Sequence, residues 1–528
     1  MRAERLVVAT LLLAGCGRKL PPGPPAPPAE AARKLLAEAG FPEGKGFPRL
    51  TFLYNTADWH RRIAAAIQEM WRTRLGLRVD LENAEWKVYL DRVDAGDFHI
   101  ARRAWIGEYA DPHAFLALFH GDSGANSTGW RSPDFERLLD QADVETDPTR
   151  RLNALAAAER ILLDEAPVAP VYHYMAHNYL KPFIRGVHPN VLDIHPLQGV
   201  TLEGEGAPPD GVLLFNAAEE PNSLDPALSH DIAGLKVLMH LFEGLVGWDP
   251  RDASPVPAAA ERWEVSPDRK TYTFHLRPAR WSNGDPVTAH DFVYAWRRVA
   301  DPRTLSKYAD RMFLVRSARA VRRGEAPPEA LGVRAADDRT LVVELEHPAP
   351  YFLDLLRLNI FYPVHRATVE RHGRDWTDLR NLVHNGPYRL TAMILNDRKV
   401  FEANPLYRAA SEVRLRKFAF LSIRDDAAAW RIYNTGGCHW LFRAPPDAVD
   451  PQSPRPDHLK CPFNAVYYLA FNTRIRPLND PRVRRALSLA IDRPKIARLV
   501  VKSGELPASR LVPPTAHPAP LPPSSLPE

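Results

Sequence analysis

The feature that most constrains the fold is a β-α-β alternation in the first third of the chain. A mostly apolar strand pattern at 50–54 and an alternating one at 77–81 enclose a stretch, 60–75, in which apolar residues recur at helical spacing. A helix pattern at 86–95 and a strand pattern at 98–105 repeat the unit. Alternation of this kind predicts a sheet covered by helices.

The rest of the chain adds shorter strands. After a polar, Gly- and Pro-containing break at 203–211, a strand is expected at 212–216, and alternating stretches follow at 271–276 and 340–345. Helices are expected at 33–39, 132–144, 150–164 and 481–489. The class is therefore mixed α/β, and 528 residues are enough for roughly two to four domains.

The charge balance gives little support to a nucleic-acid partner. The formal net charge of +5 is spread over the whole chain, and no basic run with interleaved aromatic residues occurs. No later stretch approaches eighteen consecutive apolar residues, so a channel or permease is not expected.

The three cysteines predict an exported protein rather than a metal site. Cys16 follows two arginines and a short apolar run at 6–14, and this start resembles a bacterial lipoprotein signal, in which the cysteine is lipidated. The alternative is an ordinary apolar start with a chance cysteine. Cys438 and Cys461 are expected to be buried thiols, and metal-ligand spacing is absent.

Many short motifs resemble one family. The second block contains Ser223-Leu-Asp-Pro226, Phe242-Glu-Gly-Leu245, Trp281-Ser-Asn-Gly-Asp-Pro286, Asn385-Gly-Pro-Tyr388 and Asp480-Pro-Arg-Val-Arg-Arg-Ala-Leu487. The first block contains Leu35-Leu-Ala-Glu-Ala-Gly40, Leu53-Tyr-Asn-Thr56, Glu85-Trp-Lys87 and Ala104-Trp-Ile-Gly-Glu-Tyr109. Together they resemble the oligopeptide-binding proteins of bacterial peptide ABC importers, over essentially everything after the leader.

The order of the blocks differs from that family. The part resembling the family's C-terminal portion, about 21–205, precedes the part resembling its N-terminal portion, about 207–528. The linker 203–211 would join the family's natural ends, and the cut would fall in the proline-rich stretches 511–528 and 20–28, a surface loop where cuts are tolerated. A circular permutant is one interpretation, and a rearranged gene fused from paralogue pieces is the other.

The resemblance implies a two-lobed periplasmic binding protein of type II with an additional small domain, in circularly permuted order. The expected division is a signal and lipobox at 1–20, the first part of the peptide-binding lobe at 21–176, lobe I at 177–242 and 366–470, the small domain at 243–365, and the rest of the peptide-binding lobe at 471–528.

A site that accepts varied peptides must satisfy the ligand's backbone and its charged ends. By resemblance, the stretch Ala104, Trp105, Ile106 and Gly107 would offer backbone groups to an extended peptide, and Glu108 would take the N-terminal ammonium. Most relatives carry aspartate at that position, so the extra methylene leaves the depth of the pocket open. The alternative for Glu108 is an exposed carboxylate at a strand end.

Side chains elsewhere in the sequence also match ligand-site positions of the family. Trp86 and Trp105 match tryptophans near the peptide, Arg102 an arginine of the site wall, and Tyr308 a tyrosine that touches peptide backbone. Ile232 falls where a lobe I backbone segment meets the ligand. For the tryptophans the alternative is core packing.

The expected function is capture of oligopeptides outside the cytoplasm, with hinge closure and delivery to the permease of an ABC importer. We expect a monomer without cofactor or metal, in the periplasm or at the cell surface, held to a bacterial membrane by a lipid anchor. The alternatives are a non-functional rearranged fusion, or a binder of dipeptides, nickel or haem.

An exported hydrolase is a further alternative, because Gly121-Asp-Ser-Gly124 and Thr288-Ala-His290 resemble serine-protease segments. Ala125, however, stands where the protease pattern has glycine, and the order of the two segments is inverted.

Overall fold

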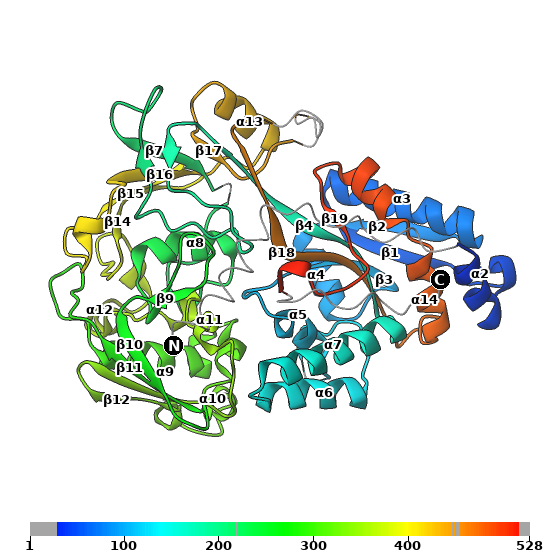
Figure 1. The fold of residues 1–528 in the computed structure, drawn as a ribbon, viewed down its shortest axis with the longest axis horizontal. Helices are drawn as coiled ribbons and strands as arrows, with labels where there is room; N and C mark the ends of the chain where they lie inside the picture. The colour runs from blue at the N-terminus through cyan, green and yellow to red at the C-terminus, as the bar shows by residue number, and fades with distance from the viewer. Residues whose placement is uncertain (1–28, 122, 218, 446–447, 449–454, 517–528) are drawn as a thin grey trace. The chain divides into compact units, whose positions relative to one another are not determined.

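The computed structural model describes residues 29–516, apart from 122, 218, 446–447 and 449–454 (Figure 1). The expected signal with Cys16, most of the leader and the chain after 516 lie outside the described residues. The chain packs into two units. In its described part, the first joins residues 29–176 to residues 461–516, and the second contains 177–448 and 455–460.

The first unit is a sheet packed with helices, as the alternation predicts. Its helices are α2 (Ala29–Glu38), α3 (Asp58–Leu75), α4 (Trp86–Asp94), α5 (His113–Leu116), α6 (Pro133–Val144), α7 (Pro148–Glu165), α14 (Pro481–Leu489) and α15 (Arg493–Lys495). Its strands are β1 (Leu50–Asn55), β2 (Val79–Ala84), β3 (Ile100–Ile106) and β19 (Leu506–Pro507), with most of β4 (Val168–Leu180) and β18 (His458–Phe471).

The strand pairing places β3 inside the sheet. β1 lies between β2 and β3 and pairs parallel with both, while β18 pairs antiparallel with β3 along all of its length, from Ile100 to Ile106. β4 follows β18 in the strand order. The strands β4 and β18 each have residues in both units.

One hydrophobic core is built from both ends of the sequence. Ile63, Ile67 and Trp71 of α3 are buried at helical spacing and pack in the same cluster as Leu36 of α2 and Leu487 of α14. Arg482 Nη1 also donates to the Glu38 carbonyl at 2.7 Å, so α14 and α2 are neighbours. Residues 480–489 and 35–54 therefore belong to one packed unit, as a single fold requires.

The turn after α3 shows why glycine ends the helix. Gly76 has φ +70°, and a Cβ there would lie 2.6 Å from the Glu43 carbonyl oxygen. The helix therefore stops where the sequence predicts, and the chain turns directly into the approach to β2.

The last described segment is more ordered than its proline content suggests. A π-helix at Ile496–Val501 leads into β19, which pairs antiparallel with His173 and Tyr172 of β4. Leu511 and Val512 are buried, so 511–516 is packed against the unit rather than forming the open loop expected from the sequence.

The second unit contains a larger and a smaller sheet. Its main strands are β7 (Val212–Asn216), β14 (Tyr388–Ile394), β15 (Arg398–Ala403), β16 (Lys417–Leu421) and β17 (Trp440–Leu441), and its smaller sheet holds β10 (Ala260–Val265), β11 (Thr271–Leu276), β12 (Val333–Asp337) and β13 (Thr340–Glu344). Its helices are α8 (Ile232–Leu241), α9 (Ala289–Ala300), α10 (Ala318–Arg322), α11 (Phe352–Leu355), α12 (Arg366–His372) and α13 (Asp426–Asn434). Two short strand pairs, β5 (Ile184–Arg185) with β6 (Thr201–Leu202) and β8 (Val246–Trp248) with β9 (Pro255–Pro257), complete it.

The linker 203–211 is a surface connection from β6 to β7. Most of its residues are exposed, and Gly204, Gly206 and Gly211 all take positive φ in its turns. Its geometry suits a join between two ordered elements. The expected division into lobes and a small domain stays a prediction.

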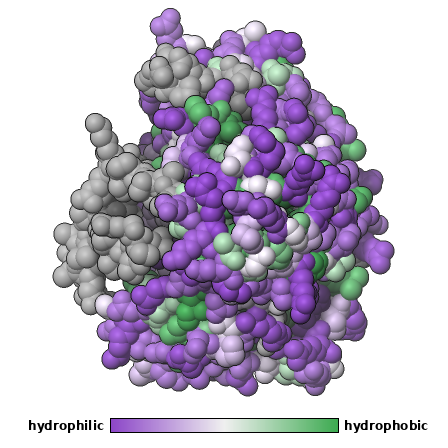
Figure 2. Space-filling model, turned by 90° about the vertical axis from the view of Figure 1, so that its right-hand side faces the viewer, coloured by the Kyte–Doolittle hydropathy of each residue, from purple (hydrophilic) through white to green (hydrophobic). Residues whose placement is uncertain are grey.

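The described helices include none that is long and apolar enough to cross a bilayer. The face shown in Figure 2 is largely hydrophilic, and its hydrophobic side chains lie in small separate patches.

Candidate ligand-binding site

Strand β3 has an open backbone edge near its end. β1 pairs with β3 only at Ile100 and Ala101, whereas β18 continues to Ile106. Gly107 N–H donates to the Asn464 carbonyl at 2.8 Å, so by alternation the backbone groups of Ala104 and Ile106 point away from β18. Ala104 and Ile106 therefore present unpaired strand edge, in the part of the chain that the structure describes, where a further strand can add.

Glu108 follows this edge by two residues and is partly exposed. The residue before it, Gly107, has no space for a side chain, because a Cβ would lie 2.5 Å from Asn464 Nδ2 and 2.7 Å from Phe115 Cε2. The loop that carries Glu108 is thus packed tightly onto β18 and α5. Glu108 therefore follows directly after the end of the open edge, and its contact with a ligand stays a prediction.

Arg102 forms a buried cationic wall beside the edge. Its residue is 8% exposed, and its guanidinium carbon lies 5.0 Å from the Tyr467 ring centroid and 5.6 Å from that of Trp59. Its Nη2 donates to the Tyr174 hydroxyl at 3.2 Å, and its Nη1 approaches Asn55 Oδ1 at 3.4 Å. No ion pair with a carboxylate occurs for Arg102 within the described residues.

The charge of Arg102 also affects its neighbour His60. Burial, with the nearby positive charge of Arg102, lowers the pKa of His60 to about 2. His60 is therefore neutral at physiological pH, and the positive charge of this region rests on the guanidinium. The aromatic partners of Arg102 come from α3, β4 and β18, which no local sequence signal connects to β3.

Trp86 is exposed, not a core residue. It is 51% exposed at the first position of α4, where Glu85 caps the helix by accepting from Lys87 N–H at 2.8 Å. Its ring stacks on Tyr89 with centroids 5.7 Å apart, and the Tyr89 hydroxyl donates to the Arg102 carbonyl. Trp86 is thereby joined to β3 through Tyr89.

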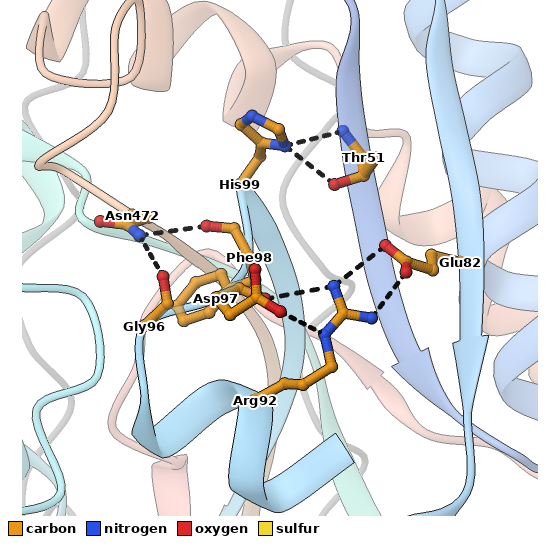
Figure 3. A network of polar contacts seen from close by, with 8 residues as sticks. All are labelled: Thr51, Glu82, Arg92, Gly96, Asp97, Phe98, His99 and Asn472. Atoms are coloured by element: carbon orange, nitrogen blue, oxygen red, sulfur yellow. Dashed lines mark hydrogen bonds and ion pairs between the residues drawn. The ribbon is translucent and has the colours of Figure 1, made fainter. Parts of the chain in front are cut away.

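The end of α4 is fixed by a polar network (Figure 3). Arg92 donates to both carboxylate oxygens of Glu82 on β2, at 2.6 and 3.2 Å, and its Nε donates to Asp97 at 2.8 Å. In the same view Asn472 Nδ2 donates to the carbonyls of Gly96 and Phe98, at 2.9 and 3.1 Å. These bonds hold both α4 and the turn that enters β3.

Trp105 is partly buried and anchored by its indole, whose Nε1 donates to the Ala114 carbonyl at 2.8 Å. This bond ties the end of β3 to α5. Ile106, the last residue of the strand, is 39% exposed. Trp105 therefore fixes the strand end, while its neighbours Ala104 and Ile106 offer the open edge.

Ile232 and Tyr308 lie in the second unit. Ile232 is 49% exposed and begins α8, whose N-cap Asp231 accepts from Gly234 N–H at 2.5 Å. Tyr308 is partly buried and lies next to His230, with ring centroids 6.2 Å apart. His230, one residue from Asp231, was not singled out by sequence, since a lone histidine in a polar turn carries no pattern.

The segments that resemble a serine protease give no support to that chemistry. His290 pairs with Asp338 at 3.5 Å with an exposed side chain, and Ser123 accepts from the Ala125 N–H at 3.3 Å in the other unit. Within the described ranges no group of three or more His, Cys, Asp or Glu side chains is placed to hold a metal ion. Cys438 and Cys461 are both buried.

The sequence matches one known protein family. The sequence model of the bacterial extracellular solute-binding proteins, family 5 (middle region), matches residues 17–127 and 254–526, well over half of the chain. The chain belongs to this family, and the mixed α/β class expected from its sequence is confirmed.

Three curated relatives show the range of the similarity. The periplasmic oligopeptide-binding protein OppA of Salmonella typhimurium is 38% identical over 308 residues, 57% of this chain and 56% of the relative. The periplasmic murein peptide-binding protein MppA of Escherichia coli is 38% identical over 311 residues, again 57% and 56%. The probable deoxycholate-binding periplasmic protein YgiS of Escherichia coli is 36% identical over 311 residues, 58% of each chain.

The chain thus spans somewhat more than half the length of the curated relatives it matches. Among solved structures, OppA of Burkholderia pseudomallei is 40% identical, with a TM-score of 0.43 and coverage of 44% of this chain and 46% of that one.

Proposed function

We propose that this chain is an extracytoplasmic binding protein that takes an oligopeptide in extended form along the open edge of β3. The observation that carries the proposal is the early divergence of β1, which leaves Ala104 and Ile106 as free strand edge beside Glu108. Relatives named for oligopeptide and murein peptide binding support the same ligand class.

The placement of Glu108 sets the direction of the ligand. Glu108 follows the C-terminal end of β3, so a peptide with its ammonium at this carboxylate runs antiparallel to the strand. Its first residue then pairs beside Ile106 and its third beside Ala104, because alternate residues share one edge. Two further side chains flank this path: Arg102, which is buried beside the edge, and Trp86, whose ring stacks on Tyr89.

The remaining roles extend the proposal to the cell. Cys16 is proposed as a lipidated anchor after signal cleavage, which would hold the protein in the periplasm or at the cell surface as a monomer. The loaded protein would deliver peptide to the permease of an ABC importer without covalent chemistry. Ile232 and Tyr308 are proposed as ligand-site residues on the family resemblance alone.

The permuted order is part of the proposal. The family model matches two separate stretches, and alignments to relatives stop near 310 residues, as expected when one block is out of order. The shared core of α2, α3 and α14 supports a complete unit rather than unrelated fused pieces.

Calorimetry with short peptides tests the ligand claim. A bond to a charged group contributes about 1.5–3 kcal/mol, so Glu108→Gln should weaken binding of a free tetrapeptide by roughly 10- to 150-fold. N-acetylation of the peptide should weaken binding to the native protein similarly and add nothing further in Glu108→Gln.

Other ligands are tested in the same experiment. Tighter binding of deoxycholate, Ni²⁺ or haem than of any peptide, or cleavage of the peptide during titration, would overturn the proposal. Absence of binding by a folded protein would support a non-functional fusion.

A further inference from the structure

A buried asparagine fixes the loop that carries Glu108. Asn464 of β18 is fully buried, and its Nδ2 donates to the Gly107 carbonyl at 3.1 Å and to the Tyr109 carbonyl at 2.9 Å. These are the carbonyls immediately before and after Glu108. A single side-chain amide therefore holds the backbone on both sides of that residue.

The orientation of the amide is itself fixed. The Thr515 hydroxyl donates to Asn464 Oδ1 at 3.0 Å, so oxygen and nitrogen of the amide have distinct partners. A flipped amide would place its oxygen against two carbonyl oxygens, which can only accept. Both amide hydrogens and the oxygen are committed, and a fully satisfied buried network of this kind is rigid.

Packing closes the remaining freedom of the loop. Gly107 N–H donates to the Asn464 backbone carbonyl, and Phe115, fully buried, fills the space where a side chain at 107 would lie. The loop thus bonds to both the backbone and the side chain of Asn464. It cannot shift outward without breaking three hydrogen bonds.

The chain holds a matched arrangement at the other end of the same strand. Asn472, 2% exposed, donates from Nδ2 to Gly96 and Phe98, the carbonyls that flank Asp97 before β3 (Figure 3). Asn464 and Asn472 therefore bind the two ends of β3 in the same way. Only Asn464 holds a loop with a proposed ligand contact.

We propose that Asn464, oriented by Thr515, is the positioning residue that holds Glu108 at the end of the open β3 edge and so sets the preference for a free peptide amino terminus. This inference rests on the proposed function of Glu108. It adds a role for Thr515, whose hydroxyl couples the last described part of the chain to Asn464.

The test compares Asn464→Ala with Asn472→Ala. Each variant loses one buried amide and two bonds to carbonyls, so both should lose similar stability in urea. The readout is the ratio of dissociation constants for an N-acetylated and a free tetrapeptide. We expect Asn464→Ala to lower this ratio at least tenfold and Asn472→Ala to keep it within twofold.

A double-mutant cycle separates this inference from the function beneath it. In a Glu108→Gln background, Asn464→Ala should leave the ratio unchanged, because the group it positions is gone. An unchanged ratio in Asn464→Ala alone, or an equal fall in Asn472→Ala, overturns the positioning role. An unchanged affinity in Glu108→Gln alone overturns instead the role of Glu108.

Thr515→Val keeps the test decisive if Asn464→Ala does not fold. Valine has nearly the same volume as threonine, so this variant removes only the hydroxyl. The two hydrogen bonds from Asn464 to the loop carbonyls can still form. A fall of about threefold in the ratio, of the order of one weak hydrogen bond, supports the inference. Retention of the full ratio in folded Thr515→Val, with Asn464→Ala unfolded, counts against it.

Discussion

Trp71 donates its indole N–H to the carbonyl of Leu487 at 2.9 Å, across 416 positions of sequence. Both residues are fully buried in the core of the first unit. A bond of this kind shows that residues near the two ends of the chain complete one fold. Two further hydrogen bonds connect the two ends of the chain: Arg510 donates to the Glu159 carboxylate, and Arg482 donates to the Glu38 carbonyl.

Arg510→Met should destabilise the protein strongly. Glu159 is fully buried and accepts from Arg510 Nε at 3.0 Å and from Val512 N–H at 2.9 Å. Removing the guanidinium leaves a buried carboxylate without its cation, which costs about 3–5 kcal/mol. Urea unfolding measures the loss. Arg137→Met, which breaks an exposed pair with Asp134, is the control and should change stability by under about 1 kcal/mol.

Gly107→Ala should weaken peptide binding and stability together. The added methyl would meet Asn464 and Phe115 at distances that require both to move. Overpacking of this kind costs about 1–3 kcal/mol, and the displaced loop carries Glu108 away from the open edge. Gly124→Ala is the control, since nothing lies within 4 Å of a Cβ there. Equal peptide affinity in the two variants would contradict the expectation.

Stability should fall with acid below about pH 6.5. Burial lowers the pKa of both His240 and His384 to about 4, from an ordinary value of 6.5. The unfolded chain therefore binds more protons than the folded one between pH 6.5 and 4, so stability is complete above 6.5 and is lost as pH falls through this window. Each histidine contributes about 3 kcal/mol over the full window.

His240→Phe tests this dependence. His240 lies among the rings of Tyr388, Phe401 and Phe418, so an aromatic replacement suits its surroundings. In this variant, the slope of the unfolding free energy against pH should fall by up to the amount that one bound proton contributes. The native protein, unfolded in parallel over the same pH range, gives the reference slope. A native slope in His240→Phe would show that His240 does not remain neutral when folded.

Restoring the family's order should preserve function if the chain is a permutant. A gene that places residues 207–528 before 21–205 keeps every contact of the shared core and moves only the ends. We expect its peptide affinity to stay within about threefold of the native order, because contacts, not connectivity, form the site. A folded reordered protein that gains binding absent from the native order would instead identify a damaging rearrangement.

Strong local periodicity made most helices of the first unit and a few strands of the second predictable. The helix at 481–489 and the strands at 212–216 and 271–276 were predicted with the bounds that the structure shows, because their patterns are uninterrupted. The π-helix and β19 were missed because each is short, and β19 is defined only by its pairing with β4.

The candidate site was harder to predict than the fold. Glu108 and Trp86 carry a local signal, through the strand end and a helix start. The aromatic partners of Arg102 and the amide of Asn464 do not, because they come from other segments: Tyr174 lies 72 positions from Arg102, and Asn464 lies 357 positions from Gly107. Long-range packing decides those contacts, and no single-sequence pattern records it.

A core assembled from both ends also sets an order of events in folding. The second unit, residues 177–448 with 455–460, is almost continuous in sequence, so its contacts do not wait for the last part of the chain. The first unit must bring α2 and α3 to α14 across more than 400 positions, a loop closure that raises contact order and slows folding. Until residues 461–516 have emerged, the apolar faces of α2 and α3 lack their partners. The protein is therefore expected to depend on chaperones for longer than a chain whose units form one after another.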